Sequence, residues 1–413
     1  MRGNDLNCVL GLPKYQILST KYFLMKIAID SWALASRFRY HGTYVYARSL
    51  IAEFRKLAAA RPELKFCLFT SPANSNDAAQ FESGNGFELV PTAELGRDRL
   101  WRLGGASRAA ARARADLIFS PAFNIMPRGE IPVVCTIHDV TPVVMPSHSK
   151  KITAVQRLWL WYCTRRARAI ITDSECSRND LIRIYGLPPE RVSVAYLGYD
   201  KEIFNESPPN EELQRGLLAR LQLDRPYILH HGIIQPRKNL KRLIEAYRLL
   251  LARNRNLEFD LVLAGSWGWQ YEEVRTAAND PKVTAGRVVF TGALESHELA
   301  TLVKGAALVV MPSLYEGFCL PMVEAMACGV PVVAANASCL PEISGGVLKY
   351  FDPYSIEDMA ACMEQALEDE ELRRNLAREG RKRAAFFDWR RCAEQTLRVL
   401  ESSTGFQHEG TLR

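Results

Sequence analysis

At 413 residues, with 48% hydrophobic and 24% charged side chains, the chain has the composition of a soluble globular protein and enough length for two domains. Membrane spans, a disulfide scaffold and a structural zinc site are not expected, because no apolar run approaches the ~20 residues that cross a bilayer and the ten cysteines show no C-x-x-C pair. The net charge of +7 is uneven: residues 1–205 carry 28 Lys+Arg against 18 Asp+Glu and residues 206–413 carry 25 against 28, so an anionic partner is expected for the first half.

Strand-like apolar runs and amphipathic helical stretches alternate along the chain after an N-terminal extension, residues 1–24. This alternation predicts an α/β protein with two doubly wound parallel sheets, one in residues 25–205 and one in residues 206–385. The predicted strands are Lys26–Asp30, Lys65–Thr70, Leu117–Phe119, Val133–Ile137, Ala169–Thr172 and Val192–Ala195 in the first domain, and Tyr227–His230, Asp260–Ala264, Val288–Thr291, Leu308–Met311 and Val332–Ala335 in the second. A linker is predicted at Glu206–Gln214, so that the carboxyl ends of both sheets would face each other across a cleft.

The first candidate site residues lie between the first predicted strand and a helix expected at Val45–Arg55. Gly42 permits close approach of a ligand to the backbone, and Thr43 is expected to be the N-cap of the helix. An ordinary turn at the start of a helix explains the same residues, so both interpretations stay open.

Two basic stretches that carry tryptophan, residues 97–114 and 157–168, hold much of the positive charge of the first half. Aromatic and basic side chains together suit the interface of an anionic membrane. Buried aromatic residues beside solvated arginines explain either stretch equally well. Taken with the uneven charge, the two stretches predict peripheral contact with an anionic membrane.

His138 follows a predicted strand and enters a loop at the carboxyl edge of the first sheet. A single histidine is more often structural than catalytic, so its position at this edge is what makes it a candidate. Asp139 is expected to orient the loop or the imidazole rather than to act as a base.

A cationic turn, residues 232–240, begins at Gly232 directly after the first strand of the second domain. Arg237 and Lys238 can hold a diphosphate there, and the free N–H groups at the start of the following helix add to the attraction. Gly265 ends another strand of this domain and would let a nucleotide approach the backbone. A plain glycine turn explains Gly265 equally well.

Glu316 and Glu324 stand eight positions apart, across a loop and the first turns of a helix. The strand Leu308–Met311 precedes them, and Pro321 suits the first turn of a helix. Glu316 therefore lies where open α/β sheets bind ligands, and Glu324 lies about two turns into the helix. Free amides near Phe318–Leu320 favour an anion, and carboxylates accept hydrogen bonds from sugar hydroxyls. The segment predicts a sugar-nucleotide site; the alternative is a pair of solvated charges.

This segment resembles the E-x7-E signature of the family 4 retaining glycosyltransferases. The match covers Pro312-Ser313, Glu316-Gly317-Phe318, Pro321, Glu324-Ala325-Met326-Ala327, Gly329 and Pro331-Val332. The resemblance extends from about Met25 to about Leu400 and implies the GT-B fold, two Rossmann-like domains facing across a cleft. Residues 25–205 would hold the acceptor and residues 206–385 the nucleotide-sugar donor. Residues 386–413 would form a helix that crosses back to the first domain, and a tail.

The resemblance also implies roles for the site residues. His138 would contact the donor sugar or the reacting centre. Arg237 and Lys238 would stabilise the leaving phosphate, Glu316 would bind sugar hydroxyls, and Glu324 would hold the ribose. The other donor-binding residues would be Gly42, Thr43, Gly232, Gly265, Gly317, Phe318, Cys319 and Leu320.

Two residues depart from the family pattern. Ile233 stands where many relatives have an arginine, and Arg237 is expected to substitute for it. Cys319 stands where glycine is usual, and its side chain is expected to crowd the sugar pocket.

The residues and the resemblance together predict a retaining, metal-independent hexosyltransferase of cell-surface polysaccharide assembly, similar to bacterial O-antigen mannosyl- or rhamnosyltransferases. GDP-mannose is the favoured donor, and a glycan or polyprenyl-linked glycan is the expected acceptor. No cofactor or metal is expected, because the chain has no D-x-D motif. We expect a cytoplasmic protein, peripheral on the inner face of the cytoplasmic membrane, with no nucleic-acid partner.

Two alternatives stay open. A GT-B sugar-nucleotide epimerase would act on the donor without an acceptor. A basic nucleic-acid-binding protein would use the first half but leave the two glutamates without a role. A dinucleotide-dependent dehydrogenase is disfavoured, since no G-x-G-x-x-G follows the first strand.

Overall fold

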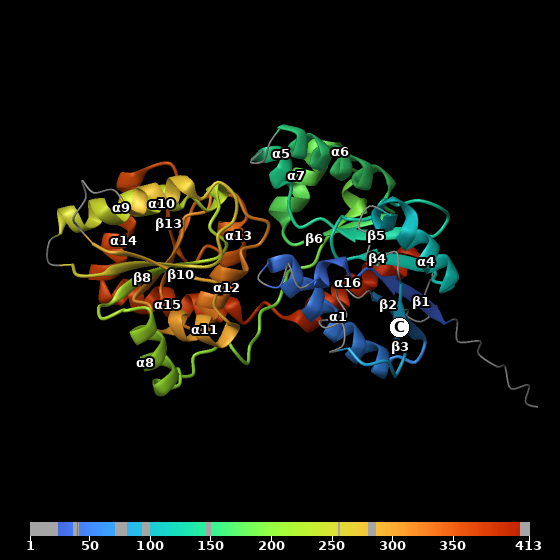
Figure 1. The fold of residues 1–413 in the computed structure, drawn as a ribbon, viewed down its shortest axis with the longest axis horizontal. Coiled ribbons are helices and arrows are strands. Elements are labelled where there is room, and N and C mark those ends of the chain that lie inside the picture. Colours follow the sequence, from blue (N-terminus) through green and yellow to red (C-terminus); the bar gives the residue numbers. More distant parts are fainter. Residues whose placement is uncertain are drawn as a thin grey trace, which may run out of the picture.

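Two parallel β-sheets flanked by helices form the two lobes of the molecule (Figure 1). The computed structural model describes residues 24–35, 39, 41–70, 81–92, 100–145, 150–254, 257–279 and 286–404, so residues 97–99 of the first basic stretch and nearly all of the N-terminal extension lie outside the described residues. The predicted fold class, an α/β protein with two doubly wound domains, is confirmed. None of the helices in the described ranges is both long and apolar enough to cross a membrane.

The first lobe contains a seven-stranded sheet in the order β3-β2-β1-β4-β5-β6-β7, in which every neighbouring pair is parallel. Its strands are β1 Met25–Ile29, β2 Leu64–Thr70, β3 Phe87–Pro91, β4 Leu117–Ser120, β5 Val133–Thr136, β6 Ala169–Thr172 and β7 Val192–Val194. Its helices are α1 Gly42–Ala60, α4 Ala106–Arg112, α5 Thr141–Val144, α6 Lys150–Arg166 and α7 Glu175–Tyr185, with a π-helical turn, Trp101–Gly105, before α4. The strand order reverses between β1 and β4, and such a switch point is where doubly wound sheets open a binding crevice.

The second lobe contains a six-stranded parallel sheet in the order β10-β9-β8-β11-β12-β13. Its strands are β8 Tyr227–His231, β9 Asp260–Ala264, β10 Val288–Gly292, β11 Leu308–Met311, β12 Val332–Ala335 and β13 Lys349–Phe351. Its helices are α8 Glu211–Arg220, α9 Leu240–Arg253, α10 Glu272–Ala278, α11 Ser296–Lys304, α12 Leu320–Ala327, α13 Leu340–Ser344, α14 Ile356–Glu368 and α15 Glu370–Ala384. The predicted linker is wrong in its second part, because α8 starts at Glu211, where Asn210 accepts a hydrogen bond from the N–H of Leu213.

The edge strands β3 and β13 were not among the predicted strands. Among the described strands, β3 forms a ladder with β2 alone, and Glu88 and Pro91 interrupt its apolar pattern. An edge strand tolerates such residues because one of its sides forms no ladder. Strand β13 has three residues, too few for a periodic pattern. In both cases pairing with the neighbouring strand, rather than local sequence, makes the segment a strand.

Helix α1 begins three residues earlier than predicted, and the N-cap role assigned to Thr43 is wrong. The N-cap is His41, which has the extended backbone that this position requires (φ −98°, ψ 143°). Gly42 and Thr43 are therefore the first two residues of the helix. Their backbone N–H groups belong to the first turn, whose amides have no partner within the helix.

The chain crosses between the lobes twice. Residues 195–210 lead from β7 to α8, and residues 385–388 lead from α15 to the last helix, α16 Trp389–Ser403, which packs on α1, β4 and β6 of the first lobe. The crossings lie side by side, since Lys201 pairs with Asp388 and Glu206 pairs with Arg381. At Gly198 a Cβ atom would lie 2.2 Å from the backbone nitrogen of Trp389, so this contact requires glycine.

Candidate active site

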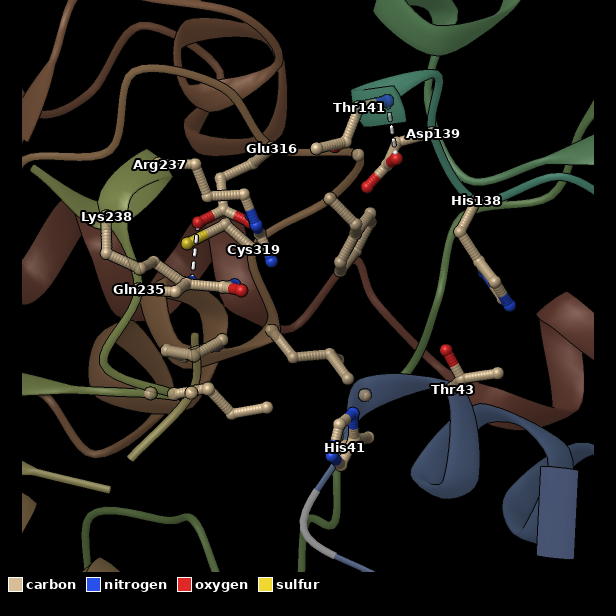
Figure 2. A pocket seen from close by; sticks show the side chains of 18 of the residues that line it. His41, Thr43, His138, Asp139, Thr141, Gln235, Arg237, Lys238, Glu316 and Cys319 are labelled. Atoms are coloured by element: carbon tan, nitrogen blue, oxygen red, sulfur yellow. Dashed lines mark hydrogen bonds and ion pairs between the residues drawn. The ribbon is translucent and has the colours of Figure 1, made fainter. Parts of the chain in front are cut away.

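A cleft of about 600 Å³ opens between the carboxyl edges of the two sheets (Figure 2). The start of α1 and the loop after β5 line it from the first lobe, and the turn after β8 and the β11–α12 segment line it from the second. Every predicted site residue except Gly265 and Glu324 lines this cleft. Those two line an adjoining cavity of about 220 Å³, which shares Gly42, Gly232 and Leu320 with the cleft. The predicted residues are thus brought together in one region, divided into a larger and a smaller compartment.

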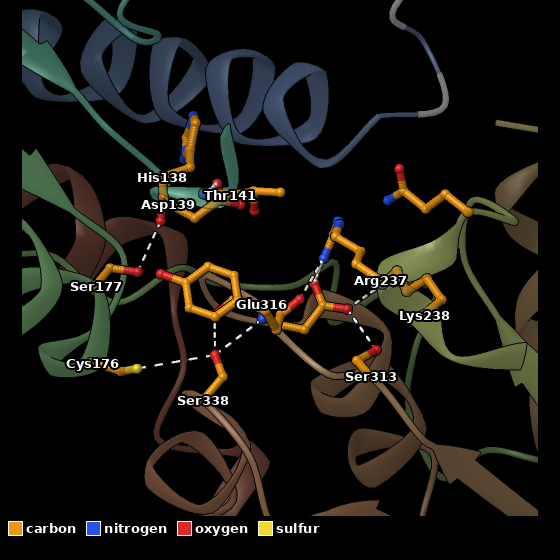
Figure 3. Close-up of polar contacts among 12 residues, drawn as sticks. His138, Asp139, Thr141, Cys176, Ser177, Arg237, Lys238, Ser313, Glu316 and Ser338 are labelled. Atoms are coloured by element: carbon orange, nitrogen blue, oxygen red, sulfur yellow. Dashed lines mark hydrogen bonds and ion pairs between the residues drawn. The ribbon is translucent and has the colours of Figure 1, made fainter. Parts of the chain in front are cut away.

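Glu316 forms a buried ionic cluster with the two cations of the turn after β8 (Figure 3). Its Oε1 atom lies 2.5 Å from Lys238 Nζ and accepts a hydrogen bond of 2.8 Å from Ser313 Oγ. Its Oε2 atom pairs with Arg237, whose Nη1 also donates to the carbonyl of Tyr315 at 3.0 Å. The carboxylate therefore fixes both cations, a role that the sequence did not indicate.

The charge state of the cluster follows from its burial. Glu316 and Lys238 are each 4% exposed. Burial alone would raise the pKa of Glu316, but the charges and hydrogen bonds of Arg237 and Lys238 outweigh it and lower that pKa to about 2. The cluster thus holds two positive charges and one negative charge, and its net positive charge faces the cleft where a diphosphate can complete it.

His138 is held by a partner that the sequence analysis did not identify. Its Nδ1 atom lies 2.7 Å from Asp173 Oδ2, and its Nε2 atom lies 3.1 Å from the carbonyl oxygen of Pro121. The carbonyl oxygen of Pro121 can only accept, so Nε2 donates to it, and the carboxylate of Asp173 favours a second proton on Nδ1 and thus a positive charge on the imidazole. Burial opposes this charge, but the charge and hydrogen bond of Asp173 outweigh it and raise the pKa of His138. Asp173 follows β6, the strand next to β5. Its position at the same sheet edge as His138 is the sequence feature that could have identified it as a partner.

Asp139 orients the loop and not the imidazole. Its Oδ1 atom accepts a hydrogen bond of 2.8 Å from the backbone N–H of Thr141, which fixes the turn into α5. The other expected role, orientation of the imidazole of His138, belongs to Asp173. Asp139 also faces Arg237 of the second lobe. Burial lowers the pKa of Arg237, but the negative charge of Glu316 and, to a smaller extent, that of Asp139 outweigh burial and raise it.

Glu324 lines the smaller cavity, and within the described ranges no lysine or arginine forms an ion pair with it. It is the fifth residue of α12, nearer the start of the helix than predicted. Its Oε2 atom lies 3.8 Å from Nδ1 of His231, whose pKa is lowered to about 3 by burial and by His230 and Lys238. Burial, aided by the negative charge of Asp200, raises the pKa of Glu324 to about 7. Its carboxyl group therefore titrates near neutral pH.

Two of the predicted glycines have a structural reason that does not involve a ligand. Gly265 has a φ of +147°, and a Cβ atom there would lie 2.1 Å from the carbonyl oxygen of Gly232. Gly232 has a φ of +137°, and a Cβ atom there would lie 3.5 Å from Lys238 Nζ. The loops after β8 and β9 therefore pack backbone to backbone, which draws the cationic turn close to the smaller cavity.

Cys319 occupies the N-cap of α12 with a left-handed backbone, φ +74° and ψ +63°. This conformation favours glycine. The side chain is buried, and burial raises the pKa of its thiol to about 12, so the thiol is protonated. The sulfur lies beside Glu316 in the cleft (Figure 2).

The lobes touch along one wall of the cleft. A Cβ atom on Gly317 would lie 2.3 Å from the carbonyl oxygen of His138, so only glycine permits this approach. The hydroxyl of Tyr315 donates to Asp180 of α7 at 2.8 Å. The carboxylate of Glu342 accepts hydrogen bonds from the first two amides of α7, at 2.7 and 2.8 Å. These contacts join the site loop of the second lobe, residues 312–319 between β11 and α12, to the loops that carry His138 and Asp173.

Phe318 has an additional role. It lines the cleft, but its ring is buried and packs edge-on against Phe387, with 5.2 Å between the ring centroids. Phe387 lies in the second crossing between the lobes, so Phe318 anchors the site loop to that crossing.

Comparison with known proteins identifies the family. Residues 41–203 match the family described as Glycosyltransferase Family 4, and residues 219–383 match Glycosyl transferases group 1. The O-antigen chain mannosyltransferase B of Escherichia coli is 31% identical over 295 residues, which cover 71% of this chain and 76% of that protein. The serotype-specific mannosyltransferase WbdA of Escherichia coli is 30% identical over 290 residues, which cover 67% of this chain and 35% of that longer protein.

A solved structure supports the same fold. The crystal structure of HepE from Anabaena in complex with UDP and glucose has a TM-score of 0.69 with this chain, covering 92% of it and 100% of HepE at 21% sequence identity. Likeness at this identity concerns the fold, and it agrees with the two sheets and the cleft between them. The chain therefore belongs to the family 4 glycosyltransferases and has their GT-B fold.

Proposed function

We propose that this glycosyltransferase moves mannose from GDP-mannose, with retention of anomeric configuration and without a metal ion, to a glycan or polyprenyl-linked acceptor. The proposed setting is the assembly of a cell-surface polysaccharide such as the O-antigen of lipopolysaccharide. The mannosyltransferases among the relatives support the sugar and the setting. The observation that carries the proposal is the buried cluster of Arg237, Lys238 and Glu316, which faces His138 across the cleft.

The cluster suits a diphosphate leaving group. When the bond to the sugar breaks, negative charge grows on the phosphate, and Arg237 and Lys238 stabilise it more in the transition state than in the ground state. Glu316 holds both cations before the substrate arrives, so little reorganisation is needed. The proposal assigns neutralisation of the diphosphate charge to the two cations, Arg237 and Lys238.

The other site residues suit the rest of the donor. A carboxylate offers about four acceptor positions, so Glu316 retains capacity for a sugar hydroxyl beside its present partners. Glu324, in the smaller cavity, accepts from the ribose hydroxyls when it is ionised. His138 can turn its Nε2–H from Pro121 to the sugar while Asp173 holds Nδ1.

Retention follows in this proposal from attack on the face that the leaving group vacates. The departing phosphate accepts the proton of the acceptor hydroxyl. Asp139, the carboxylate nearest in sequence to His138, is held by the amide of Thr141 and serves the loop. The proposed location is the cytoplasmic side of the cytoplasmic membrane, and the free thiols of the described cysteines suit that reducing compartment.

The test is a transfer assay with purified full-length protein and a panel of GDP-, UDP-, dTDP- and ADP-sugars. We expect GDP-mannose to raise the melting temperature most, because a ligand that binds the native state stabilises it. With an acceptor, the product should carry an α-linked mannose, as read by NMR, and EDTA should not change the rate. Conversion of the donor without an acceptor would support an epimerase instead, and a rate lost in EDTA would contradict the metal-independent mechanism.

A further inference from the structure

Exposed large hydrophobic side chains gather on one part of the first lobe. Six of the ten in the described residues lie on two elements: Leu100 and Leu103 at the π-helical turn, and Ile152, Val155, Leu158 and Trp161 on α6. Leu158 is 63% exposed, Val155 58% and Trp161 47%. Because residues three apart lie near one another on a helix, these three form a continuous stripe along α6. Such a patch on a soluble fold marks a surface that binds a partner.

The opposite side of α6 packs on the lobe, so the stripe is not the face by which the helix joins the core. Leu160 is fully buried in a cluster with Ile137 and Ile170, and Cys163 is fully buried as well. Trp159, one residue from the stripe, donates a hydrogen bond to the carbonyl of Phe123 at 2.6 Å. The helix therefore has one apolar face for the lobe and a second, outward apolar face.

The two elements form one surface. The hydroxyl of Tyr162 donates to the carbonyl of Pro127 at 3.2 Å, and Arg128 donates to the carbonyl of Leu103 at 3.3 Å. The guanidinium of Arg102 lies 5.9 Å from the centre of the Trp159 ring. These contacts join α6 to the π-helical turn. The first basic stretch is only partly as predicted, because its Trp101 is fully buried and belongs to the core.

The border of the stripe is positively charged. Lys151, Arg157, Arg165, Arg166 and Arg168 are exposed on or directly after α6. Residues 140–172 contain no Asp or Glu at all. An apolar stripe bordered by cations is complementary to a bilayer with anionic headgroups, since each basic residue near such a surface adds attraction and the apolar side chains enter the acyl boundary. A folded protein partner would not require this uniform sign of charge.

The stripe adjoins the cleft. Gln156, between Val155 and Arg157 on α6, lines the cleft together with Thr141 and Pro142 of α5. Arg157 ties the two helices by donating to the carbonyls of Pro142 and Val143 at 3.1 Å. Figure 1 shows α5 and α6 together at the top of the first lobe, with α5 on the side toward the second lobe.

We propose that the outward face of α6, with Val155, Leu158 and Trp161 as its centre and Leu100 and Leu103 beside it, docks on an anionic lipid bilayer. A lipid-linked acceptor would then enter the cleft from the membrane along α5 and α6. The docking surface stands on the contacts above, and it rests on the proposed function only for the identity of that acceptor.

The test is flotation of the full-length protein with vesicles of phosphatidylcholine alone or mixed equally with phosphatidylglycerol. We expect binding to the mixed vesicles that weakens as salt rises, because salt screens the basic border. The double variant Val155→Glu with Leu158→Glu should partition roughly tenfold or more weakly, since it removes two apolar anchors and adds two negative charges. The matched control Tyr354→Glu changes an aromatic residue that is 67% exposed on the second lobe and should bind as wild type does.

Each result decides the matter. Wild type that fails to float with either vesicle, or a double variant that floats like wild type, overturns the proposal. A wild-type dimer in solution that the double variant converts to a monomer also overturns it, because a second copy would then cover the face; salt-sensitive binding to DNA in place of vesicles does the same. Thermal melting and donor binding of the double variant separate docking from folding and from the proposed function, since both should match wild type.

Discussion

Glu316 and Glu324 belong to one signature, yet the pKa of the first is lowered to about 2 and the pKa of the second is raised to about 7. Burial raises the pKa of both. At Glu316 two cations outweigh it, whereas the side chain of Glu324, 16% exposed, has a neutral histidine and the negative charge of Asp200 as neighbours. The carboxylate of Glu316, in the loop before α12, is therefore ionised at every pH near neutrality, whereas that of Glu324, in the second turn of α12, becomes ionised only near neutral pH. Identical residues in one motif can thus perform different electrostatic tasks.

The largest effect on the transfer rate is expected from breaking the ionic cluster of Glu316, Arg237 and Lys238. Lys238→Ala removes a cation that is 2.5 Å from Glu316, and transfer should slow roughly 10²–10³-fold if that cation stabilises the leaving phosphate. Arg237 remains to pair Glu316, so the fold should persist. The measurement is kcat with saturating donor. Lys241→Ala, which removes an exposed lysine three residues away, is the control and should retain the wild-type rate; equal rates in both variants would argue against the cluster.

The role of Glu324 is tested by the pH dependence of donor affinity. The donor is a diphosphate diester that does not titrate near neutrality, so its affinity should report the ionisation of Glu324 if that residue binds the ribose hydroxyls, because a carboxylate accepts hydrogen bonds more strongly than a carboxylic acid. Affinity should rise about tenfold between pH 6 and pH 8 for a pKa of about 7, as measured by calorimetry. In Glu324→Gln the dependence should vanish. A wild-type affinity that is flat over this range would mean that Glu324 does not bind the donor.

The same carboxyl also predicts a sign for stability. Its folded pKa lies above the unfolded value, so its ionisation destabilises the native state, and this contribution to the free energy of unfolding falls as pH rises from about 4.5 to about 7. Glu324→Gln should therefore raise the melting temperature at pH 8 and leave it nearly unchanged at pH 4.5. A shift of equal size at both values would point to packing rather than charge.

Asp173 provides a third carboxylate, paired with a base. In Asp173→Asn the carboxamide cannot stabilise the imidazolium of His138, so the pKa of His138 should fall. The alkaline limb of the pH profile of kcat/KM should then move to lower pH, with a severalfold loss of rate at pH 8. A uniform loss of rate without movement of the limb would indicate a structural role alone.

The smallest effect concerns Cys319, which lies between the two glutamates. Cys319→Gly should change the free energy of unfolding by about 1 kcal/mol or less, because relief of the left-handed backbone offsets the lost burial of the thiol. Cys328→Gly is the control at the other end of α12, where φ is −71° and glycine brings no relief. Denaturant unfolding should show the control to be the less stable variant; equal losses would contradict strain at Cys319.

Much of the fold was predictable because buried parallel strands have continuous apolar sequences. Strands β9, β11 and β12 have the predicted bounds, and burial on both faces explains why. The edge strand β3 was not predictable, since its backbone is ordered by β2 and its sequence carries Glu88 and Pro91. Local capping was also misread at Thr43, where His41 has the N-cap backbone without a capping side chain.

The residues of the site could be predicted from the sequence, but the contacts between them could not. Spacing and the positions of strand ends singled out Glu316, Lys238 and His138, which the fold brings to one cleft. The pairing of Glu316 with Lys238 joins residues far apart in sequence, and the support of His138 by Asp173 requires the adjacency of β5 and β6. Pairing and pKa depend on burial, which spacing along the chain does not contain.

The paired crossings between the lobes have a mechanical consequence. The chain passes from one lobe to the other at two neighbouring places, which are joined by the ion pairs of Lys201 with Asp388 and of Glu206 with Arg381 near the end of α15. Two neighbouring crossings favour a hinge motion of the lobes about the line that joins the crossings. Each opening and closing of the cleft should therefore return Arg237 and Lys238 to the same position opposite His138.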